Sequence, residues 1–566
     1  MTIRKQFLNV LAILTIAAAS ALSVEKLDRG LTAMEQPDGS VFISWRLFQE
    51  DPDDISFLLM RRDRSDLGSF VDLPLPLNGG ATSFLDRTAE SKKTYEYILF
   101  DKRTPTQGIE KARINLTGKA KPYISIPLKG DYDFQKVGIG DLDGDGQYEY
   151  VIKQPNFNTD PYQQPGYWKK STTTYKLEAY ELDGRLMWRY DMGWSIEAGI
   201  WYSPWIVYDV DGDGKAEVYC KAGEGDPRDE KGLVQSGPEY LVKLNGETGE
   251  VMAKTDWLSR DGFSSYNYYC RNFLTVAYLD GKTPSLIMQR GTYRLIKQQA
   301  LDKDFNRIWY WAAEPGGDYE KYRGQSSHGL ISADVDQDGC DELVIGAAVI
   351  DHDGSPLWSL GMGHPDECYC ADIDPGNPGL EIFYGFETRQ NTDGFCVVDA
   401  RTSRKLWTHK EPTRHLHGQG MCADVLADFP GMETYGGERD TKDRWLYSAD
   451  GVLIKVYQGG TLSPRPVWWD DDPQKEVVLN GAVCNWDEPP LLKLDGRLIA
   501  VADCLGDHRE ELIVSAKGEK GGEIRIYTTN IPTWKPRPCL MQDRQYRLGV
   551  CAQTMGYYYP AQLGLQ

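Results

Sequence analysis

The sequence predicts an all-β protein, with an eight-bladed β-propeller preceded by a small β-sandwich domain. An acidic turn recurs along most of the chain, and short apolar runs of the kind that form strands stand on both sides of each copy. The 57 Gly, 33 Tyr and 16 Trp are typical of many short strands joined by tight turns. An earlier segment has strand patterns without acidic turns, which indicates a separate domain.

The first 23 residues have the pattern of a signal peptide. Arg4 and Lys5 precede an apolar run, residues 7–18, and small residues follow at 19–21. The apolar run is shorter than the roughly 20 residues that a membrane helix needs, and no later stretch approaches that length. We therefore expect residues 1–23 to be removed and the mature protein to be secreted or periplasmic, without a membrane span.

Residues 24–118 are predicted to form the sandwich domain. Strand patterns at residues 40–45, 55–60 and 94–99 are bounded by turn formers such as Pro37-Asp38-Gly39. An inward-facing Trp45 makes this segment similar to a fibronectin type III-like module. We expect it to act as a scaffold.

Residues 119–566 repeat a unit of strand, acidic turn and strand. Five of the turns are incomplete, and they begin at Tyr278, Asp372, Asp424, Asp470 and Asp503. Three copies are complete: Asp141–Glu149, Asp209–Glu217 and Asp334–Glu342. A four-stranded blade needs about 40–45 residues, so these turns fit eight blades. Seven blades would also fit, because the last two turns lie close together.

The complete turns have the spacing of calcium-binding loops. Carboxylates at positions 1, 3 and 5 converge, Gly at position 6 permits a sharp turn, and a later acid closes a cage of oxygens, the donors that Ca²⁺ prefers. The closing acid stands at position 9 and a strand follows, so the loop is not a helix-loop-helix sensor. The alternative is an acidic turn without metal. The predicted ligands are Asp141, Asp143, Asp145, Glu149, Asp209, Asp211, Asp213, Glu217, Asp334, Asp336, Asp338 and Glu342.

The composition excludes several classes of function. The formal net charge of -21 argues against binding to nucleic acid or an anionic membrane through a general field, so a polyanionic ligand must be held by local cations. The 11 cysteines include no Cys-x-x-Cys pair, which excludes a zinc ribbon or a thioredoxin-type centre. An odd number also leaves at least one thiol unpaired or bridged to another chain. We expect Cys368 and Cys370 to be small core residues.

Several linked motifs resemble polysaccharide lyase family 11, the rhamnogalacturonan lyases. The resemblance covers nearly all of the mature chain. It implies an eight-bladed propeller, bound Ca²⁺ and β-elimination on the rhamnose-galacturonate backbone of pectin, an acidic plant polysaccharide. The motifs are residues 209–224, 236–241, 289–293, 371–381, 506–511 and 545–548.

The resemblance also implies candidate site residues. The metal near the cleft would be held by His328, His364 and Asp366. Asn158 and Glu178 would contact the substrate, with Glu178 in place of an aspartate. Tyr557 matches a tyrosine linked to catalysis, and Arg465 is the nearest candidate for a catalytic arginine. The chemistry needs such groups, because removing the C5 proton of a galacturonate requires a base and a cation that neutralises the carboxylate.

The sequence departs from the family where a basic residue is expected. A shortened stretch, residues 484–490, replaces a family segment that carries a lysine into the cleft. Arg290 is one of several basic residues that would compensate from another loop. Trp201 offers an aromatic face on which a pyranose ring can stack.

Three functions from different classes agree with these features. The first is a secreted, calcium-dependent lyase that acts as a monomer on rhamnogalacturonan or a related uronate polymer. The second is a non-catalytic, calcium-stabilised propeller that binds carbohydrate. The third is an adhesion propeller similar to the repeats of integrin α-chains, which does not share the motifs of the lyase family.

Overall fold

The computed structural model describes residues 25–64, 68–75, 81–161, 168–199 and 202–556. Nearly all regular structure in these ranges is β-strand, as the sequence predicts. Their helices are α1 (Tyr266–Tyr269), α2 (Arg544–Ala552) and the 3₁₀ turns η1 (Glu320–Tyr322) and η2 (Leu540–Gln542). No helix in these ranges has the length and apolar character needed to cross a membrane. The predicted signal peptide lies outside the described residues.

The N-terminal part consists of two antiparallel sheets with a common core. Trp45 is fully buried there, together with Phe57 and Tyr97, which confirms the predicted inward position of Trp45. The strand patterns predicted in this segment correspond to β2, β3 and β6. One sheet has the order β1-β2-β5 and the other β4-β3-β6-β7. The strands are β1 (Thr32–Glu35), β2 (Val41–Ser44), β3 (Phe57–Asp63), β4 (Val71–Leu73), β5 (Ser83–Asp86), β6 (Thr94–Asp101) and β7 (Gly108–Asn115).

The rest of the described chain forms eight four-stranded antiparallel sheets. The first four are made of β9 (Lys136–Gly140), β10 (Glu149–Gln154), β11 (Lys176–Tyr180) and β12 (Leu186–Asp191); β13 (Trp205–Tyr208), β14 (Glu217–Gly223), β15 (Glu239–Leu244) and β16 (Val251–Asp256); β17 (Asn272–Ala277), β18 (Ser285–Arg290), β19 (Lys297–Leu301) and β20 (Arg307–Ala312); and β21 (Ser326–Ala333), β22 (Glu342–Gly346), β23 (Ala348–Ile350) and β24 (Pro356–Ser359).

The other four follow the same order along the chain, except that the last takes one strand from far upstream. They are made of β25 (Pro365–Ala371), β26 (Glu381–Phe386), β27 (Phe395–Asp399) and β28 (Lys405–Thr408); β29 (Met421–Ala423), β30 (Glu433–Gly437), β31 (Asp443–Tyr447) and β32 (Leu453–Gln458); β33 (Arg465–Val467), β34 (Glu476–Leu479), β35 (Ala482–Cys484) and β36 (Leu492–Lys493); and β37 (Arg497–Ala502), β38 (Glu511–Gly518), β39 (Gly521–Tyr527) and β8 (Tyr123–Pro127).

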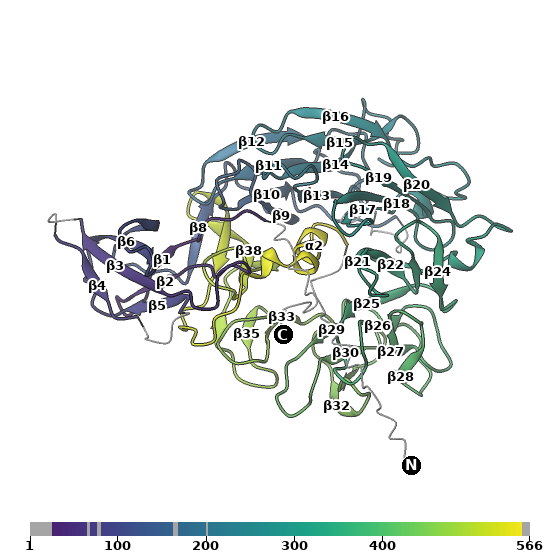
Figure 1. Cartoon of the computed structure of the whole chain (residues 1–566). Coiled ribbons are helices and arrows are strands. Elements are labelled where there is room, and N and C mark those ends of the chain that lie inside the picture. Colours follow the sequence, from purple (N-terminus) through teal and green to yellow (C-terminus); the bar gives the residue numbers. More distant parts are fainter. Residues whose placement is uncertain (1–24, 65–67, 76–80, 162–167, 200–201, 557–566) are drawn as a thin grey trace, which may run out of the picture.

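The eight sheets are arranged in a ring around α2 (Figure 1). First strands of neighbouring sheets contact one another in the pairs β9–β13, β13–β17, β17–β21, β21–β25 and β29–β33, and β37 of the last sheet contacts β9 of the first. Each acidic turn found in the sequence connects the first and second strands of one sheet. The turns at Asp470 and Asp503, which lie close together in sequence, therefore belong to two different sheets.

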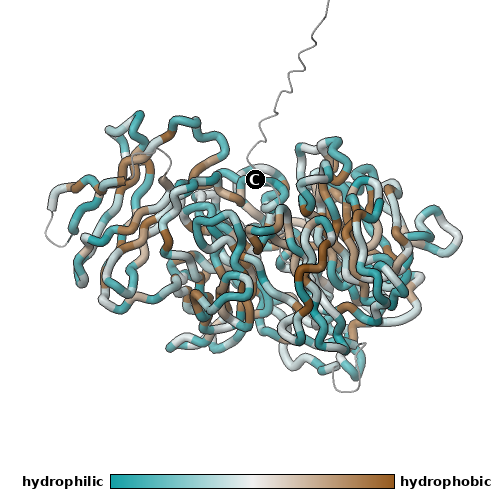
Figure 2. The backbone as a smooth tube through the Cα atoms, turned by 90° about the horizontal axis from the view of Figure 1, so that it is seen from below, coloured by the Kyte–Doolittle hydropathy of each residue, from teal (hydrophilic) through white to brown (hydrophobic). Residues whose placement is uncertain are grey.

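Apolar side chains fill the spaces between neighbouring sheets. Cys368 and Cys370 of β25 pack with Val344 of β22, which confirms their prediction as core residues. None of the 11 cysteines forms a disulfide bond, and all except Cys340 are buried. In Figure 2 the hydrophobic colour is concentrated along strands, and the turns at their ends are mostly hydrophilic.

The helix α2 lies in the middle of the ring and contacts β9, β13, β17 and β21. Asp543 caps its N-terminus by accepting a hydrogen bond from the Tyr546 amide at 2.8 Å. The guanidinium of Arg547, fully buried, donates to the carbonyls of Ile139 and Val207 on two inner strands. These bonds fix the helix relative to the ring.

One arginine joins the N-terminal sheets to the ring. Arg46 is 1% exposed and donates to the backbone carbonyls of Gly146 and Cys504, which belong to the first and last sheets of the ring. Its third partner is the carboxylate of Asp28, at 2.9 Å. A buried guanidinium is costly unless its N–H groups have acceptors, so these contacts hold the N-terminal sheets in place relative to the ring.

Candidate functional site

The first acidic loop has the geometry of a cation site. Asp141 accepts hydrogen bonds from the amides of Gly144 and Gly146, and Glu149 accepts one from the amide of Leu142. Oxygen atoms of Asp141, Asp143 and Glu149 lie within 4.8 Å of one another. Burial, together with the neighbouring acids, raises the pKa of Asp141 to about 6 and that of Glu149 to about 8. A bound cation would remove this repulsion, so the loop fits Ca²⁺.

The second acidic loop already contains a cation of its own. The Lys243 ammonium lies 2.7 Å from Asp211 and 2.9 Å from Glu217. Burial would raise the pKa of Asp211, but the hydrogen bond from Lys243 holds it below its usual value. Asp209 binds the amides of Gly212 and Gly214, as in the first loop. The loop backbone is therefore conserved between the two copies, whereas the charge at the centre is supplied differently.

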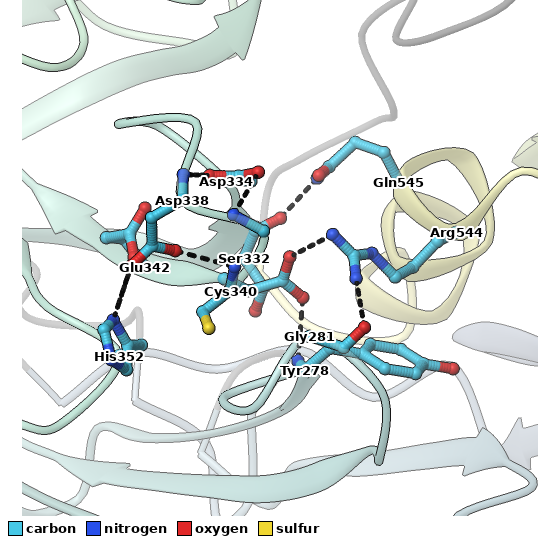
Figure 3. A network of polar contacts seen from close by, with 12 residues as sticks. Tyr278, Gly281, Ser332, Asp334, Asp338, Cys340, Glu342, His352, Arg544 and Gln545 are labelled. Carbon is cyan, nitrogen blue, oxygen red and sulfur yellow. Dashed lines mark hydrogen bonds and ion pairs between the residues drawn. The ribbon is translucent and has the colours of Figure 1, made fainter. Parts of the chain in front are cut away.

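The third acidic loop repeats the same backbone contacts. Asp334 accepts from the amide of Gly339 at 3.0 Å, and Glu342 accepts from the amide of Val335 at 2.8 Å. Burial raises the pKa of Glu342 to about 8. Figure 3 shows this loop with His352 on one side and α2 on the other. The acids at the fifth position of the three loops, Asp145, Asp213 and Asp338, are exposed.

A cluster of histidines and acids lies elsewhere, and we call it the histidine cluster: His328, His364, Asp366, Glu387, His415 and His417. The structure brings the three sequence-predicted members together. The Nε2 atoms of His364 and His328 lie 3.3 and 3.5 Å from Asp366 Oδ1. Side-chain atoms of His328, His364, Asp366 and Glu387 suited to a metal lie within 4.8 Å of one another, as do those of Asp366, His415 and His417.

Sequence reasoning missed three members of this cluster. Glu387 Oε2 lies 3.3 Å from His364 Nε2, and its other oxygen lies 3.5 Å from His415 Nε2. His417 Nδ1 lies 2.6 Å from Asp366 Oδ2. The two missed histidines stand in the loop before β29, in the segment His415-Leu416-His417. Two histidines so close together are notable because the whole chain has only seven. That pair was a signal in the sequence, but its partners are distant in the chain.

The protonation of the cluster suits a metal ion. Burial, and then the charge of His364, lowers the pKa of His328 well below its ordinary value. Burial alone would raise the pKa of Asp366, but hydrogen bonds from His364 and His417 hold it far below the usual range. His364 Nδ1 donates to the carbonyl of Ser326, so the bond from Nε2 to Asp366 requires a protonated ring, and a bound cation would take the place of that Nε2 proton. Neutral imidazole and ionised carboxylate are the forms that bind divalent cations.

Aromatic and basic side chains extend from the histidine cluster toward Asn158. The Tyr293 ring lies 4.8 Å from that of His364, and the guanidinium of Arg271 lies 4.8 Å from the Tyr293 ring. Arg271 in turn pairs with Asp160 at 3.7 Å. Asn158 is exposed and stands two residues before Asp160, in the segment that follows β10.

A buried lysine is linked through Gly556 to the backbone of His328. Lys136, 5% exposed at the start of β9, donates to the carbonyl of Gly556 at 3.1 Å. Gly556 lies directly against His328, because any side chain at this glycine would overlap the His328 carbonyl oxygen. Burial, and then the charges of Arg465 and Arg497, lowers the pKa of Lys136 to about 7. Lys136 was missed, although a lysine opening an apolar strand was its signal.

Two predicted substrate residues lie in the interior instead. Glu178 is fully buried, and its carboxylate accepts hydrogen bonds from Tyr180 at 2.8 Å and Arg189 at 2.5 Å. Arg290 is also fully buried and pairs with Glu239 at 2.5 Å. Both groups therefore already have charged or polar partners in the folded protein, and their role as substrate contacts stays a prediction. Tyr557 and Trp201 lie outside the described residues.

The histidine cluster and the acidic loops lie at opposite ends of the inner strands. His328 stands near the beginning of β21, and Asp334 directly follows its end. The helix α2 runs between the same two ends, since Arg544 at its start pairs with Asp341 and Gly556 beyond its end contacts His328.

Two family profiles match the chain. One, described as "Rhamnogalacturonan lyase family 11, C-terminal domain", matches residues 125–565. The other, described as "Rhamnogalacturonan I lyases beta-sheet domain", matches residues 22–107.

Individual relatives are similar over almost their whole length. The rhamnogalacturonan endolyase YesW of Bacillus subtilis (strain 168) is 34% identical, with 96% of this chain and 91% of the relative covered. The rhamnogalacturonan exolyase YesX of the same organism is 32% identical, with 95% and 94% covered. A crystal structure of YesW matches with a TM-score of 0.85 at 33% identity, covering 95% of this chain and 96% of that one. The rhamnogalacturonan lyase PL11 of Bacillus licheniformis matches with a TM-score of 0.84 at 32% identity, covering 96% and 97%. The chain therefore belongs to polysaccharide lyase family 11, the rhamnogalacturonan lyases.

Proposed function

We propose that this protein is a secreted, calcium-dependent lyase that cleaves the rhamnogalacturonan backbone of pectin by β-elimination at galacturonate. The observation that carries the proposal is the histidine cluster, whose imidazole and carboxylate donors suit a cation and to which Lys136 is linked through the backbone of Gly556. The names of the relatives as rhamnogalacturonan endolyase and exolyase support the substrate. They also make a purely carbohydrate-binding role the weaker alternative.

The residues around the cluster fit the steps that this reaction needs. A divalent cation held by the histidine cluster would neutralise the galacturonate carboxylate and so make the C5 proton more acidic. Lys136 in its neutral form is the base that accepts this proton, since its pKa lies near neutrality. Arg465 adds positive charge nearby, and Tyr557, which follows Gly556 in the chain, is the second proposed catalytic residue.

The metal assignments follow the chemistry of each donor set. The acidic loops offer oxygen atoms, which Ca²⁺ prefers, and the first loop is the best proposed calcium site. The histidine cluster offers nitrogen as well as oxygen, which also suits ions such as Mn²⁺. We propose Ca²⁺ there on the resemblance to the family, with the identity of the ion decided by metal analysis of the purified protein.

We also propose the finer description of the fold. Eight sequential four-stranded sheets, with the last completed by β8, support an eight-bladed propeller for residues 119–566. The two sheets of β1–β7 support a fibronectin type III-like sandwich for residues 24–118. Export after removal of residues 1–23 is tested by sequencing the N-terminus of the protein recovered outside the cytoplasm.

The activity is tested by following the ultraviolet absorbance of unsaturated uronides. The mature protein is incubated with de-esterified rhamnogalacturonan, with and without a chelator, and product sizes separate endo from exo cleavage. We expect absorbance to rise, to be lost with the chelator and to return with added metal. Binding of the polymer without any absorbance gain across a panel of uronate polymers would overturn the proposal in favour of the binding alternative.

A further inference from the structure

We propose that the third acidic loop, together with Cys340 and His352, is a site for a borderline transition-metal ion such as Zn²⁺ and not another calcium loop. The site lies at the end of the ring opposite to the histidine cluster. The proposal is therefore independent of the proposed function.

The third loop differs from the other two in several positions, and one of them brings a thiol. At position 7, directly after the glycine of position 6, the first loop has Gln147, the second has Lys215 and the third has Cys340. Cys340 is also the one cysteine of the chain that is not buried. A thiol thus replaces an amide or ammonium at the rim of a cage of oxygens.

A histidine from the neighbouring turn approaches the same loop. His352 stands between β23 and β24, and its Nδ1 lies 2.8 Å from Asp351 Oδ1, 3.5 Å from Asp338 Oδ2 and 3.7 Å from Glu342 Oε1. Donor atoms of Asp338, Cys340 and His352 all lie within 4.8 Å of one another, as do those of Glu342, Asp351 and His352. Figure 3 shows His352 joined to Glu342 by a dashed line, with Cys340 close to both.

A buried carboxylate oxygen is left open toward this cluster. Glu342 is fully buried, and its Oε2 is used by the Val335 amide. Its Oε1 has no hydrogen-bond partner among the described residues, and its nearest polar neighbour given by the structure is His352 Nδ1. A buried unpaired carboxylate oxygen is costly, and a cation bound between these groups would satisfy it.

The donor set decides the class of metal. Ca²⁺ takes oxygen ligands almost exclusively, whereas Zn²⁺ takes thiolate, imidazole and carboxylate in a tetrahedral arrangement. With bond lengths of about 2.0–2.3 Å, tetrahedral ligands stand roughly 3.5 Å apart, so donors within 4.8 Å need only a small closure. Thiolate, imidazole and carboxylate together favour Zn²⁺ or Co²⁺ over Ca²⁺.

The site is connected to the central helix. Asp341, between Cys340 and Glu342, lies 3.3 Å from the guanidinium of Arg544 and accepts from the Tyr278 amide at 2.8 Å. Arg544 also donates to the carbonyl of Gly281 at 3.2 Å. A metal that fixes this loop should therefore also stabilise the start of α2, which Figure 3 shows beside it.

Cobalt titration of the full-length, metal-stripped protein tests the proposal. We expect one equivalent of Co²⁺ to give a thiolate-to-cobalt charge-transfer band, which Cys340→Ser abolishes and His352→Gln weakens at least tenfold in affinity. Cys220→Ala, which removes a buried thiol from another sheet, should leave the band unchanged. No band in the wild type, or a band that survives in Cys340→Ser, would overturn the assignment.

Thiol protection gives a second and independent readout. A small alkylating reagent should modify Cys340 in the native protein before the ten buried cysteines, as peptide mapping would detect. Equimolar Zn²⁺ should slow this modification at least tenfold, while the same concentration of Ca²⁺ should not. Equal protection by both ions would show that the loop is a calcium site, and the proposal would fail.

Discussion

The acidic loops and the histidine cluster both gather negative side chains, but they are built in different ways. The first acidic loop is contained in one run, Asp141–Glu149, and its backbone amides already bind its first and last carboxylates. The histidine cluster takes its members from separate segments, at His328, His364, Glu387 and the loop before β29. A loop of the first kind depends little on the rest of the fold. The cluster forms only when several sheets are correctly placed. Its geometry therefore depends on the whole ring.

Their positions agree with a division of work. The loops lie at one end of the inner strands and the cluster at the other, beside Lys136 and Gly556. We therefore expect changes in the cluster to affect turnover and changes in the loops to affect stability. The following predictions test this separation, beginning with the largest effect.

Replacing His364 with alanine should lower kcat by about 1000-fold, because the proposed cation and the ionised Asp366 both lose a partner. The initial rate of uronide formation measures the effect, and thermal unfolding measures stability. Glu149→Gln is the matched control from the acidic loops and should retain kcat. Equal losses of activity in the two variants would remove the distinction between the two regions.

Replacing Lys136 with arginine should lower kcat by about 100-fold, because the arginine keeps its charge and cannot accept a proton. The pKa of Lys136, lowered to about 7, makes the amine neutral above that pH. The wild-type rate should therefore rise with pH up to about 7 and then level, falling about tenfold per pH unit below. This limb should disappear in Lys136→Arg. A limb that persists in the variant would assign the base to another group.

Replacing Glu149 with glutamine should weaken calcium binding to the first loop without changing the rate. The wild type should gain about 2–3 kcal/mol of unfolding free energy at calcium concentrations roughly 100 times Kd, and the variant should gain much less. Denaturant unfolding with calcium or with a chelator measures both. If chelation destabilises the two proteins equally, the first loop is not a calcium site.

Replacing Lys243 with methionine should convert the second loop into one that depends on calcium. Without calcium the variant should lose about 1–2 kcal/mol, since Asp211 and Glu217 then lack their positive partner. Added calcium should restore this loss, and the protein should bind one more ion than the wild type by calorimetry. Unchanged ion stoichiometry would mean that the wild-type loop already holds calcium beside the lysine.

The sequence was most informative where a structure is local. The eight acidic turns could be found because each lies within a short run, and all eight connect the first two strands of a sheet. Lys243 could not be assigned to the second loop, because it reaches Asp211 across strand pairing and not along the chain. The burial of Glu178 and Arg290 could not be predicted for the same reason. A charged residue in a strand can face the interior when partners such as Arg189 or Glu239 pair with it, and these pairs form only in the folded protein.

The pairing of β8 with β39 has a consequence for the synthesis of the protein. Ser125 and Glu523 are partners separated by 398 positions, so the edge of the last sheet is translated long before the strand that completes it. At about 5–20 residues per second, the early strand waits roughly 20–80 seconds with its backbone groups unpaired. Exposed strand edges of this kind invite aggregation. The ring can therefore close only after nearly the whole chain has been synthesised. Until then, β8 must be kept from pairing with a non-native strand.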